Sequence, residues 1–393
     1  MSPDPAEVSA SPSGVTPPRR PDNLATLTKG MDMQQNQKTV ITVVGARPQF
    51  VKAGPVSRAL QQEGLREIIV HTGQHYDEGM SDVFFRELGI PAPGYHLGAG
   101  GGSHGAMTGR MLEKIEEVLL KEKPDALLVY GDTNSTLAGA LAAAKVHIPV
   151  AHVEAGLRSF NRRMPEELNR VCTDHLATWL YCSSDHGANQ LRTEGIVNGV
   201  FVVGDVMADV FYSTQTQLEA DAAFLDTIRN GAGGDFDLLT IHRADTASDA
   251  GKLKALLEVI GETGRAVRFP MHPRTRLLLR EAGVVVPDNI KVLEPAGYRE
   301  MVAMLLLCER VITDSGGLQK EAYWARKPCI TLRTETEWVE TLADGWNVLA
   351  GVDPVTVGQI LQATAVPETH PLLYGDGQAA SRIARHLSKV LGQ

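Results

Sequence analysis

The stretch Ala126-Leu127-Leu128-Val129-Tyr130-Gly131-Asp132-Thr133 decides the fold of this chain. Its apolar first part predicts a strand, and the alanine-rich segment from about Thr136 to Val146 predicts the helix that follows. A second apolar run, residues 148–153, predicts the next strand. A strand, a helix and a strand in this order give two parallel strands whose carboxyl ends point to the same edge of a sheet.

Three carboxylates follow these predicted strands. Asp132 follows the first strand, Glu154 follows the second, and Glu166 lies at the start of the next predicted helix. Open α/β sheets bind ligands at this edge, so we expect Asp132 and Glu154 to meet in one cleft with Glu166 close behind. Clustered carboxylates push each other's pKa values apart, which suits proton transfer. Helix capping, or ion pairs with Arg158, Arg162 or Arg163, accounts for the same residues equally well.

The alternation of strands and helices continues along the chain and predicts two domains. The other strands are expected at 40–44, 67–71, 179–182 and 200–203, and then at 236–241, 266–270, 290–293, 311–313, 329–332 and 347–349. This is the pattern of a doubly wound parallel α/β fold. We expect a disordered, proline-rich extension over 1–38, one Rossmann-like domain over 39–205, a second over 206–375, and a C-terminal helix over 376–393 that crosses back to the first domain. A cleft between two domains is a common ligand site.

The composition bounds the class of protein. The 393 residues are enough for two domains with full cores. A net charge of −9 argues against a general nucleic-acid binder. The four cysteines stand far apart without a CxxC pair, which indicates neither a zinc site nor a redox dithiol and favours a reducing cytoplasm. No apolar run approaches the roughly 20 residues that a membrane span needs.

The strand at 311–313 leads into an expected anion site. It is followed by Asp314-Ser315-Gly316-Gly317, which opens a helix. Free N–H groups and the helix dipole favour an anion at such a turn, and the two glycines let a phosphate approach the backbone closely. Glu321, about two turns into the helix, is placed to accept hydrogen bonds from a ribose diol. A simple N-cap at Ser315 is the alternative.

Basic residues follow two other predicted strands. Arg47 and Lys52 come after the first strand of the chain, and His242 and Arg243 come after the strand at 236–241. Cationic side chains at strand ends are expected to clamp a diphosphate, although a solvated helix start explains Arg47 and Lys52 as well. The ligand that fits a basic second domain and an acidic first domain is a sugar joined to a nucleoside diphosphate.

Two glycine patterns are less informative. The loop 98–105 lacks the Lys-Ser/Thr ending of a phosphate-binding P-loop, and no strand is predicted to lead into it, so we interpret it as a mobile loop. A GxGxxG turn is missing after the first strand of either half, which weakens any prediction of NAD or FAD binding.

From about Val40 to its C-terminus the chain resembles the non-hydrolysing UDP-N-acetylglucosamine 2-epimerases. The motifs that carry the resemblance are Gly45-Ala46-Arg47-Pro48 with Lys52, Tyr130-Gly131-Asp132-Thr133, His152-Val153-Glu154-Ala155-Gly156-Leu157-Arg158, Pro165-Glu166-Glu167-Leu168-Asn169-Arg170, Thr240-Ile241-His242-Arg243, Thr313-Asp314-Ser315-Gly316-Gly317-Leu318-Gln319-Lys320-Glu321 and Tyr374-Gly375-Asp376-Gly377-Gln378-Ala379.

The resemblance implies a glycosyltransferase-B-like fold, in which two facing Rossmann-like domains hold the active site between them, usually in a homodimer. It implies a cytoplasmic enzyme of cell-surface polysaccharide biosynthesis that turns UDP-GlcNAc into UDP-ManNAc by eliminating UDP and adding it back, with neither a metal nor a redox cofactor. By motif, the resemblance assigns acid/base and sugar-cation roles to Asp132, Glu154 and Glu166, and a role with the departing diphosphate to His242. The implied binding residues are Arg47, Lys52, Arg243, Ser315, Gly316, Gly317, Glu321 and Arg333.

One departure from the family pattern leaves the sugar open. Many members carry Arg-Asp-Thr-Thr-Glu-Arg-Pro where this chain has Arg333-Thr334-Glu335-Thr336-Glu337-Trp338-Val339-Glu340. Together with Thr72-Gly73-Gln74-His75-Tyr76-Asp77, this form is similar to a branch that includes epimerases of UDP-2,3-diacetamido-glucuronic acid. The alternative substrate is therefore this diacetamido uronic acid. The alternative functions are a hydrolysing epimerase that releases ManNAc, a retaining glycosyltransferase, and a UDP-sugar sensor without catalysis.

Overall fold

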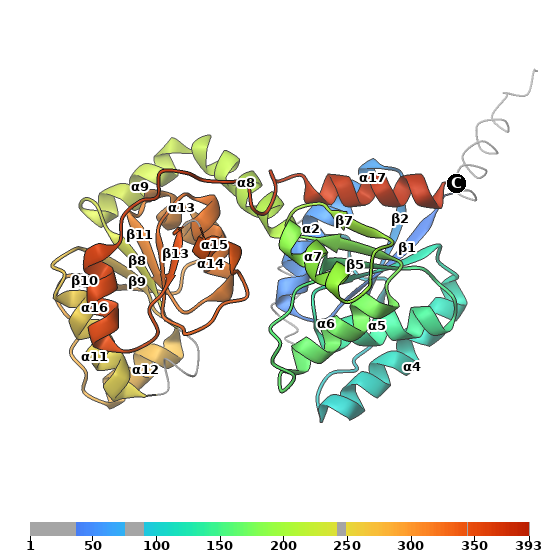
Figure 1. Cartoon of the computed structure of the whole chain (residues 1–393), viewed down its shortest axis with the longest axis horizontal. Helices are drawn as coiled ribbons and strands as arrows, with labels where there is room; N and C mark the ends of the chain where they lie inside the picture. Colours follow the sequence, from blue (N-terminus) through green and yellow to red (C-terminus); the bar gives the residue numbers. More distant parts are fainter. Residues whose placement is uncertain (1–36, 75–89, 242–248, 344, 393) are drawn as a thin grey trace, which may run out of the picture. The chain divides into compact units, whose positions relative to one another are not determined.

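The computed structural model describes residues 37–74, 90–241, 249–343 and 345–392. Most of the predicted disordered extension, residues 1–36, therefore lies outside the described residues. The residues from Lys38 onward form one compact unit, which contains two parallel sheets with helices against them (Figure 1). Lys38 already belongs to this unit, since its ammonium group lies 2.9 Å from the carboxylate of Asp125.

The first sheet has seven parallel strands in the order β3-β2-β1-β4-β5-β6-β7. Their bounds are β1 (Thr39–Val44), β2 (Arg66–His71), β3 (Tyr95–His96), β4 (Ala126–Tyr130), β5 (Val150–Ala155), β6 (Trp179–Cys182) and β7 (Val200–Val202). All residues of β1 and β4 are buried, as expected for strands covered by helices on both faces. The strand order reverses between β1 and β4, and such a switch point is where doubly wound sheets bind ligands.

Helices cover both faces of this sheet. They are α2 (Arg47–Gln62), α4 (His104–Glu122), α5 (Asn134–Lys145), α6 (Pro165–Leu176) and α7 (Asp185–Thr193). Figure 1 shows α2 on one face and α4, α5 and α6 on the other. The Thr133 side chain caps α5 by accepting from the amide of Thr136 at 3.2 Å. Gln49 of α2 donates to the carbonyl of Tyr130 at 2.9 Å and so ties the start of α2 to the end of β4.

The second sheet has six parallel strands in the order β10-β9-β8-β11-β12-β13. Their bounds are β8 (Asp237–Thr240), β9 (Val267–Pro270), β10 (Ile290–Leu293), β11 (Arg310–Thr313), β12 (Cys329–Thr331) and β13 (Asn347–Leu349). The surrounding helices are α8 (Val206–Glu219), α9 (Ala222–Ala232), α11 (Ala250–Gly261), α12 (Pro273–Glu281), α13 (Tyr298–Leu307), α14 (Gly316–Trp324), α15 (Glu340–Ala343) and α16 (Pro354–Ala363). Here the order reverses between β8 and β11, so α14 begins beside a second switch point.

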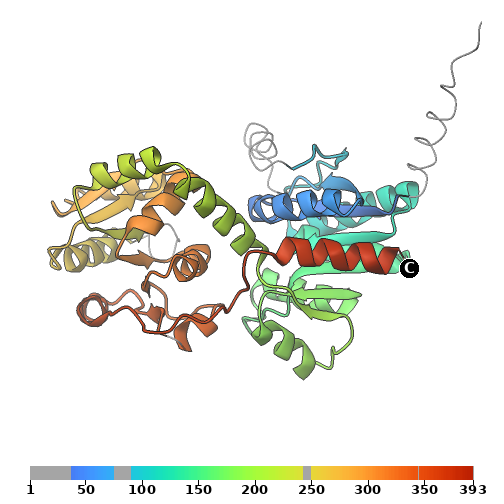
Figure 2. The same ribbon diagram turned by 90° about the horizontal axis from the view of Figure 1, so that it is seen from above.

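The last helix, α17 (Ala379–Leu391), packs against α2 rather than against the second sheet (Figure 2). Ile383 and Leu387 are fully buried in the same hydrophobic cluster as Val40 of β1. Asp209 of α8 accepts hydrogen bonds from the amides of Ala379 and Ala380, at 3.0 and 2.8 Å, and thereby caps α17 from outside. The hydrophobic core around the first sheet thus contains side chains of α17 as well as of β1.

The α/β class and the doubly wound pattern are confirmed by these two sheets, with one correction. The prediction that no strand leads into the glycine-rich loop 98–105 is wrong, because β3 ends at His96 and pairs with β2. That strand is only two residues long, too short for a pattern in the sequence to reveal it. Within the described ranges, no helix is long and apolar enough to cross a membrane.

Candidate active site

Asp132 and Glu154 lie together at the carboxyl edge of the first sheet. Their strands β4 and β5 are neighbours, with Tyr130 paired to Val153. Gly131 separates β4 from Asp132 at a φ of 60°, and a Cβ built on it would lie 3.2 Å from Oε2 of Glu154. Only glycine fits this position without strain or displacement of the Glu154 carboxylate.

Glu154 itself adopts a conformation that is rare for a residue with a side chain. Its φ is 71°, and the pairing of β5 with β6 shifts register between Val153 and Ala155. A bulge of this kind re-aims one side chain. Non-glycine residues in the left-handed region cost free energy and cluster at functional sites, so the strain itself marks Glu154 as a candidate.

Two lysines hold the Glu154 carboxylate. Lys52 of α2 forms an ion pair with Oε2, and Lys320 of α14 lies 3.7 Å from Oε1. Burial works against the ionised carboxyl, but the two lysines outweigh it and lower the pKa of Glu154 to about 2. Glu154 is therefore an anion at every physiological pH. Lys320 also pairs with Asp205, the N-cap of α8, so this cation links three separate segments of the chain.

Asp132 has the opposite electrostatic environment. Burial raises its pKa and the neighbouring Glu154 adds to the shift, although Arg170 of α6 forms an ion pair with the carboxylate and opposes both. Arg170 also contacts Glu167 at 3.2 Å, and the side chain of Asn169 donates to the Asp132 carbonyl at 2.9 Å. The two carboxyls at this edge thus have pKa values shifted in opposite directions, the pattern expected of groups with different roles in proton transfer.

The third predicted carboxylate lies apart from these ion pairs. Glu166 is exposed in the first turn of α6, whereas its neighbour Glu167 is only 3% exposed. The Glu167 carboxylate accepts hydrogen bonds from the amides of Ser159 and Phe160 at 2.8 and 2.9 Å. Glu167 therefore shapes the loop before α6, and Glu166 is the member of the pair that is open to a ligand.

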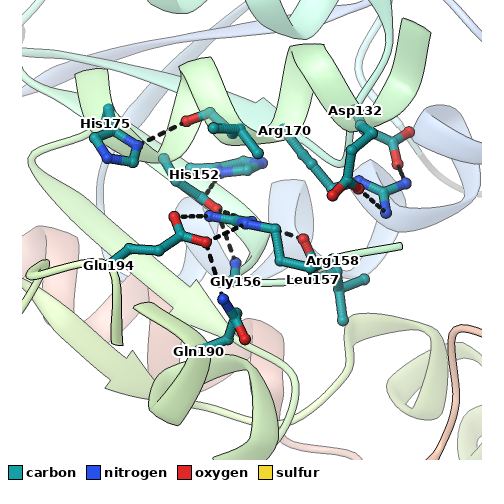
Figure 3. A network of polar contacts seen from close by, with 12 residues as sticks. Asp132, His152, Gly156, Leu157, Arg158, Arg170, His175, Gln190 and Glu194 are labelled. Carbon is teal, nitrogen blue, oxygen red and sulfur yellow. Dashed lines mark hydrogen bonds and ion pairs between the residues drawn. The ribbon is translucent and has the colours of Figure 1, made fainter. Parts of the chain in front are cut away.

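A buried network supports this edge from behind (Figure 3). His152 contacts Asp174 through Nδ1 and the Gly131 carbonyl through Nε2, both at 2.7 Å. A carbonyl only accepts, so Nε2 donates to it. Asp174 also accepts from the Gly156 amide at 3.1 Å and from Arg158 at 2.7 Å. His152 and Asp174 together fix the backbone on both sides of the carboxylates.

Arg158 closes this network at its outer side. Its Nε and Nη2 atoms each lie 2.7 Å from an oxygen of Glu194, in the paired geometry that Figure 3 shows. A bidentate contact of this kind is directional as well as strong. The alternative in which Arg158 pairs with a candidate carboxylate is wrong, because Arg158 pairs with Asp174 and Glu194. Asp132 pairs instead with Arg170 of α6, which that alternative did not include.

The second sheet carries a cavity of about 310 Å³ at its own switch point. Its lining includes Thr240 at the end of β8 with Ile241 after it, His272 after β9, and Ser315, Gly317 and Glu321 at the N-cap and within α14. Burial raises the pKa of Glu321 to about 7, although Lys320 opposes the shift. Near neutral pH this carboxyl can therefore both donate and accept a hydrogen bond, which suits a pair of hydroxyl groups.

The predicted phosphate turn is the N-terminus of α14. The Ser315 hydroxyl accepts from the Leu318 amide at 3.4 Å, so the N-cap that the sequence allowed is present. On the other side of the turn, Arg333 pairs with Glu337 at 3.1 Å through two nitrogens. A Cβ on Gly316 would lie 3.8 Å from the Arg333 guanidinium.

The remaining predicted residues are placed as follows. Arg47 is exposed at the first position of α2. His242 and Arg243 lie outside the described residues. So do His75, Tyr76 and Asp77, which end the motif that begins at Thr72. Among the residues that the structure describes, no group of three or more His, Cys, Asp or Glu side chains could hold a metal ion.

Comparisons with known proteins agree on one family. The family model described as UDP-N-acetylglucosamine 2-epimerase matches residues 58–388. The chain is 46% identical over 357 residues to a UDP-N-acetylglucosamine 2-epimerase homolog of Methanococcus maripaludis, covering 89% of this chain and 99% of the relative. It is 47% identical over 366 residues to the UDP-2,3-diacetamido-2,3-dideoxy-D-glucuronate 2-epimerase of Pseudomonas aeruginosa, with the same coverage.

Solved structures give the same result. The UDP-GlcNAc 2-epimerase of Methanocaldococcus jannaschii, in complex with UDP-GlcNAc and UDP, superposes with a TM-score of 0.76 at 40% identity, covering 89% of this chain and 99% of that one. The Neisseria meningitidis enzyme bound to UDP-GlcNAc gives 0.77 at 28% identity, covering 89% and 100%. The glycosyltransferase-B-like fold that the resemblance implies is confirmed by these neighbours.

Proposed function

Since this chain belongs to the UDP-N-acetylglucosamine 2-epimerase family, we propose that it reversibly inverts C2 of a UDP-2-acetamido sugar, with UDP-GlcNAc and UDP-ManNAc as the expected pair. The observation that carries the proposal is the pair Asp132 and Glu154, two adjoining carboxyls whose pKa values are shifted in opposite directions. An enzyme that moves a proton at a carbon beside a developing cation needs one carboxyl that can carry the proton and one that stays ionised beside the cation.

The proposed reaction is an elimination followed by the reverse addition. The C1–O bond breaks and its electron pair leaves with UDP, while the C2 proton passes to a base of the protein and a 2-acetamidoglucal is formed. UDP then adds back at C1, and C2 receives a proton on the opposite face. Because the C2 proton is weakly acidic, departure of the diphosphate leads, and stabilising its charge is the first demand on the site.

The environments of the three carboxylates suggest a division of roles. Asp132, with its raised pKa, is the proposed group that exchanges a proton with C2. Glu154, held ionised by two lysines, is the proposed counter-charge for the cationic ring. Glu166 is exposed on α6, the helix that supplies Arg170 to Asp132, and is the proposed proton group for the other face.

The UDP half of the substrate is assigned to the second sheet. We place the nucleoside in the cavity beside Ser315, Gly317 and Glu321, with the ribose hydroxyls at Glu321. The diphosphate lies over the N-terminus of α14 at Gly316, within reach of Arg333. Contacts of Arg47, Lys52, His242 and Arg243 with the diphosphate are proposed from their motifs. The domain boundaries at residues 205 and 375 remain predictions.

One alternative substrate is favoured by a specific observation. The Pseudomonas aeruginosa relative at 47% identity is an epimerase of UDP-2,3-diacetamido-2,3-dideoxy-D-glucuronate, and the segment Glu337-Trp338-Val339-Glu340 is similar to that branch. The diacetamido uronic acid is therefore the second candidate for the sugar. Elimination and addition at C1 and C2 would be the same for both.

NMR in D2O tests the reaction and the sugar together. Each UDP-sugar is incubated with the protein, and we expect deuterium at C2 and an epimeric nucleotide sugar for the true substrate. The Asp132→Asn variant is the control that should bind UDP without exchanging deuterium. Release of free ManNAc as the only product would refute the non-hydrolysing assignment and favour the hydrolase.

We further propose that the chain acts in the cytoplasm as a homodimer, in the supply of activated sugars for cell-surface polysaccharides. Light scattering coupled to size-exclusion chromatography tests the dimer. A mass near 42.4 kDa, that of one chain, would contradict it.

A further inference from the structure

The indole of Trp338 lies beside the start of α14 and has no role in the reaction outlined above. Trp338 is 8% exposed, and its Nε1–H has no hydrogen-bond partner within the part of the chain that the structure describes. A buried N–H group without an acceptor costs free energy, so its presence needs an explanation. A Cβ built on Gly316 would lie 3.8 Å from this Nε1, which places the donor beside the turn at the helix start.

Trp338 is held firmly in this position. Its amide donates to the Thr336 hydroxyl at 3.1 Å, and its carbonyl accepts from the Thr341 hydroxyl at 2.7 Å. Its ring meets Tyr374 edge to face, with centroids 6.0 Å apart. Contacts on the backbone and on the ring fix the direction in which the indole N–H points.

The other tryptophans give a contrast. Trp346 donates its Nε1–H to the Thr369 carbonyl at 2.7 Å, as a buried indole usually does. Trp324 shares the missing partner, but it is the last residue of α14, at the end of the helix away from the turn. Among the four tryptophans, all of which the structure describes, Trp338 alone combines a buried, unpartnered donor with a position beside Gly316.

The ring of Trp338 has a second contact, with Lys320 of α14, which in turn reaches Glu154 of the first sheet. The Lys320 ammonium lies 3.7 Å from the ring centroid, in a cation–π contact, and the same ammonium is 3.7 Å from Oε1 of Glu154. One side chain therefore faces the anion-binding turn with its N–H and the lysine of Glu154 with its ring.

We propose that Trp338 is a positioning residue that binds the diphosphate with its indole N–H and holds Lys320 against Glu154 with its ring. The inference builds on the proposed function, because it takes the anion at the α14 turn to be a nucleoside diphosphate. In this arrangement, binding of the diphosphate and the position of the Glu154 carboxylate are coupled through the rigid indole of Trp338.

Indole NMR of the full chain tests the first contact directly. The sequence has four tryptophans, so 15N-labelling of the indoles gives four Nε1–H signals, assignable by single Trp→Phe variants. We expect saturating UDP to shift the Trp338 signal downfield, as a new bond to a charged oxygen forms, and uridine to leave it in place. The Trp346 signal should stay unchanged with both ligands.

Two variants separate the contacts of the N–H and of the ring. Trp338→Phe keeps an aromatic face for Lys320 and should weaken UDP binding about tenfold without changing the affinity for uridine. Trp338→Leu removes both contacts and should lower kcat further. Trp346→Phe, the matched control, should bind UDP as the unchanged protein does.

The outcomes distinguish this inference from the proposed function. If UDP binds and the Trp338 signal does not move, or Trp338→Phe binds UDP with unchanged affinity, the contact with the diphosphate is refuted while the epimerase assignment stands. If UDP fails to bind the wild-type chain, both are overturned. Equal kcat for the Phe and Leu variants would refute the role of the ring.

Discussion

Replacing Lys52 with Met should show how much the ion pair with Glu154 contributes to the free energy of unfolding. Methionine has nearly the same volume, so the change removes the charge and leaves the packing of α2 largely intact. Lys52 and Glu154 have side chains only 13% and 11% exposed, and Lys320 at 3.7 Å is the second cation at that carboxylate. Breaking this buried pair leaves the Glu154 charge without its main partner and with Lys320 alone, which is more costly than losing a surface pair.

The size of the effect follows from the pKa of Glu154. Lowering a carboxyl from its ordinary 4.5 to about 2 corresponds to about 3 kcal/mol of stability at neutral pH. Because the folded pKa lies below the unfolded one, this contribution is complete above about pH 5 and is lost as the pH falls toward 2. We expect Lys52→Met to lose most of it at pH 7 and to differ less from wild type at pH 3.

Urea unfolding at pH 7 and pH 3 measures both differences. Lys38→Met is the matched control, because its partner Asp125 is 2.9 Å away but the pair is exposed, at 45% and 31% of the side chains. That variant should lose at most about 1 kcal/mol. A Lys52→Met protein with wild-type stability at pH 7, or with a stability gap of the same size at both pH values, would refute the account of Glu154.

Three further predictions concern the same edge and the last helix. Gly131→Ala should lose more than about tenfold in turnover and about 1 kcal/mol of folding stability. Gly64 has a φ of 75° and no atom close to an added Cβ, so Gly64→Ala should lose folding stability but keep its turnover. Equal turnover in the two variants would contradict the packing of Gly131 against Glu154. Glu154→Gln should bind UDP but turn over at least about a hundredfold more slowly, measured by coupled assay and calorimetry, and retained turnover would remove Glu154 from the mechanism. Burial raises the pKa of Asp209 to about 6, so ionisation disfavours the folded state above the unfolded value of 3.8. Asp209→Asn should accordingly gain stability over wild type as the pH rises from 4 to 7, by up to about 3 kcal/mol, and a pH-independent difference in urea unfolding would argue against it.

The sequence predicted that Asp132 and Glu154 lie together because strand ends in a parallel sheet converge by geometry alone. Asp132 and Glu154 each follow an apolar run, and no knowledge of side-chain packing was needed to bring them together. It could not tell which of Glu166 and Glu167 faces inward, because adjacent helical residues differ by about 100° and the phase is set by tertiary packing. The structure buries Glu167 and leaves Glu166 open.

The residues that sequence reasoning missed act across long separations. Lys320 reaches Glu154 and Asp205, which precede it by more than a hundred residues, and Arg170 reaches Asp132 from α6, beyond α5 and β5. Lys320 and Arg170 both lie in motifs that carry the family resemblance. A motif in the sequence does not show, however, which distant carboxylate its charged residue contacts. The backbone strain at Glu154 is likewise visible only in the structure, because no residue type next to Glu154 in the sequence predicts a φ of 71°.

The packing of α17 has a consequence for how the chain is made. Ile383 and Leu387 belong to the same buried cluster as Val40 and Leu128, although the whole second sheet lies between them in the sequence. The core of the first sheet therefore has an unfilled apolar surface until α17 has been synthesised and can pack against α2. A nascent chain stalled before Ala379 should accordingly remain a substrate for chaperones that recognise exposed apolar segments, even though its first sheet is fully synthesised.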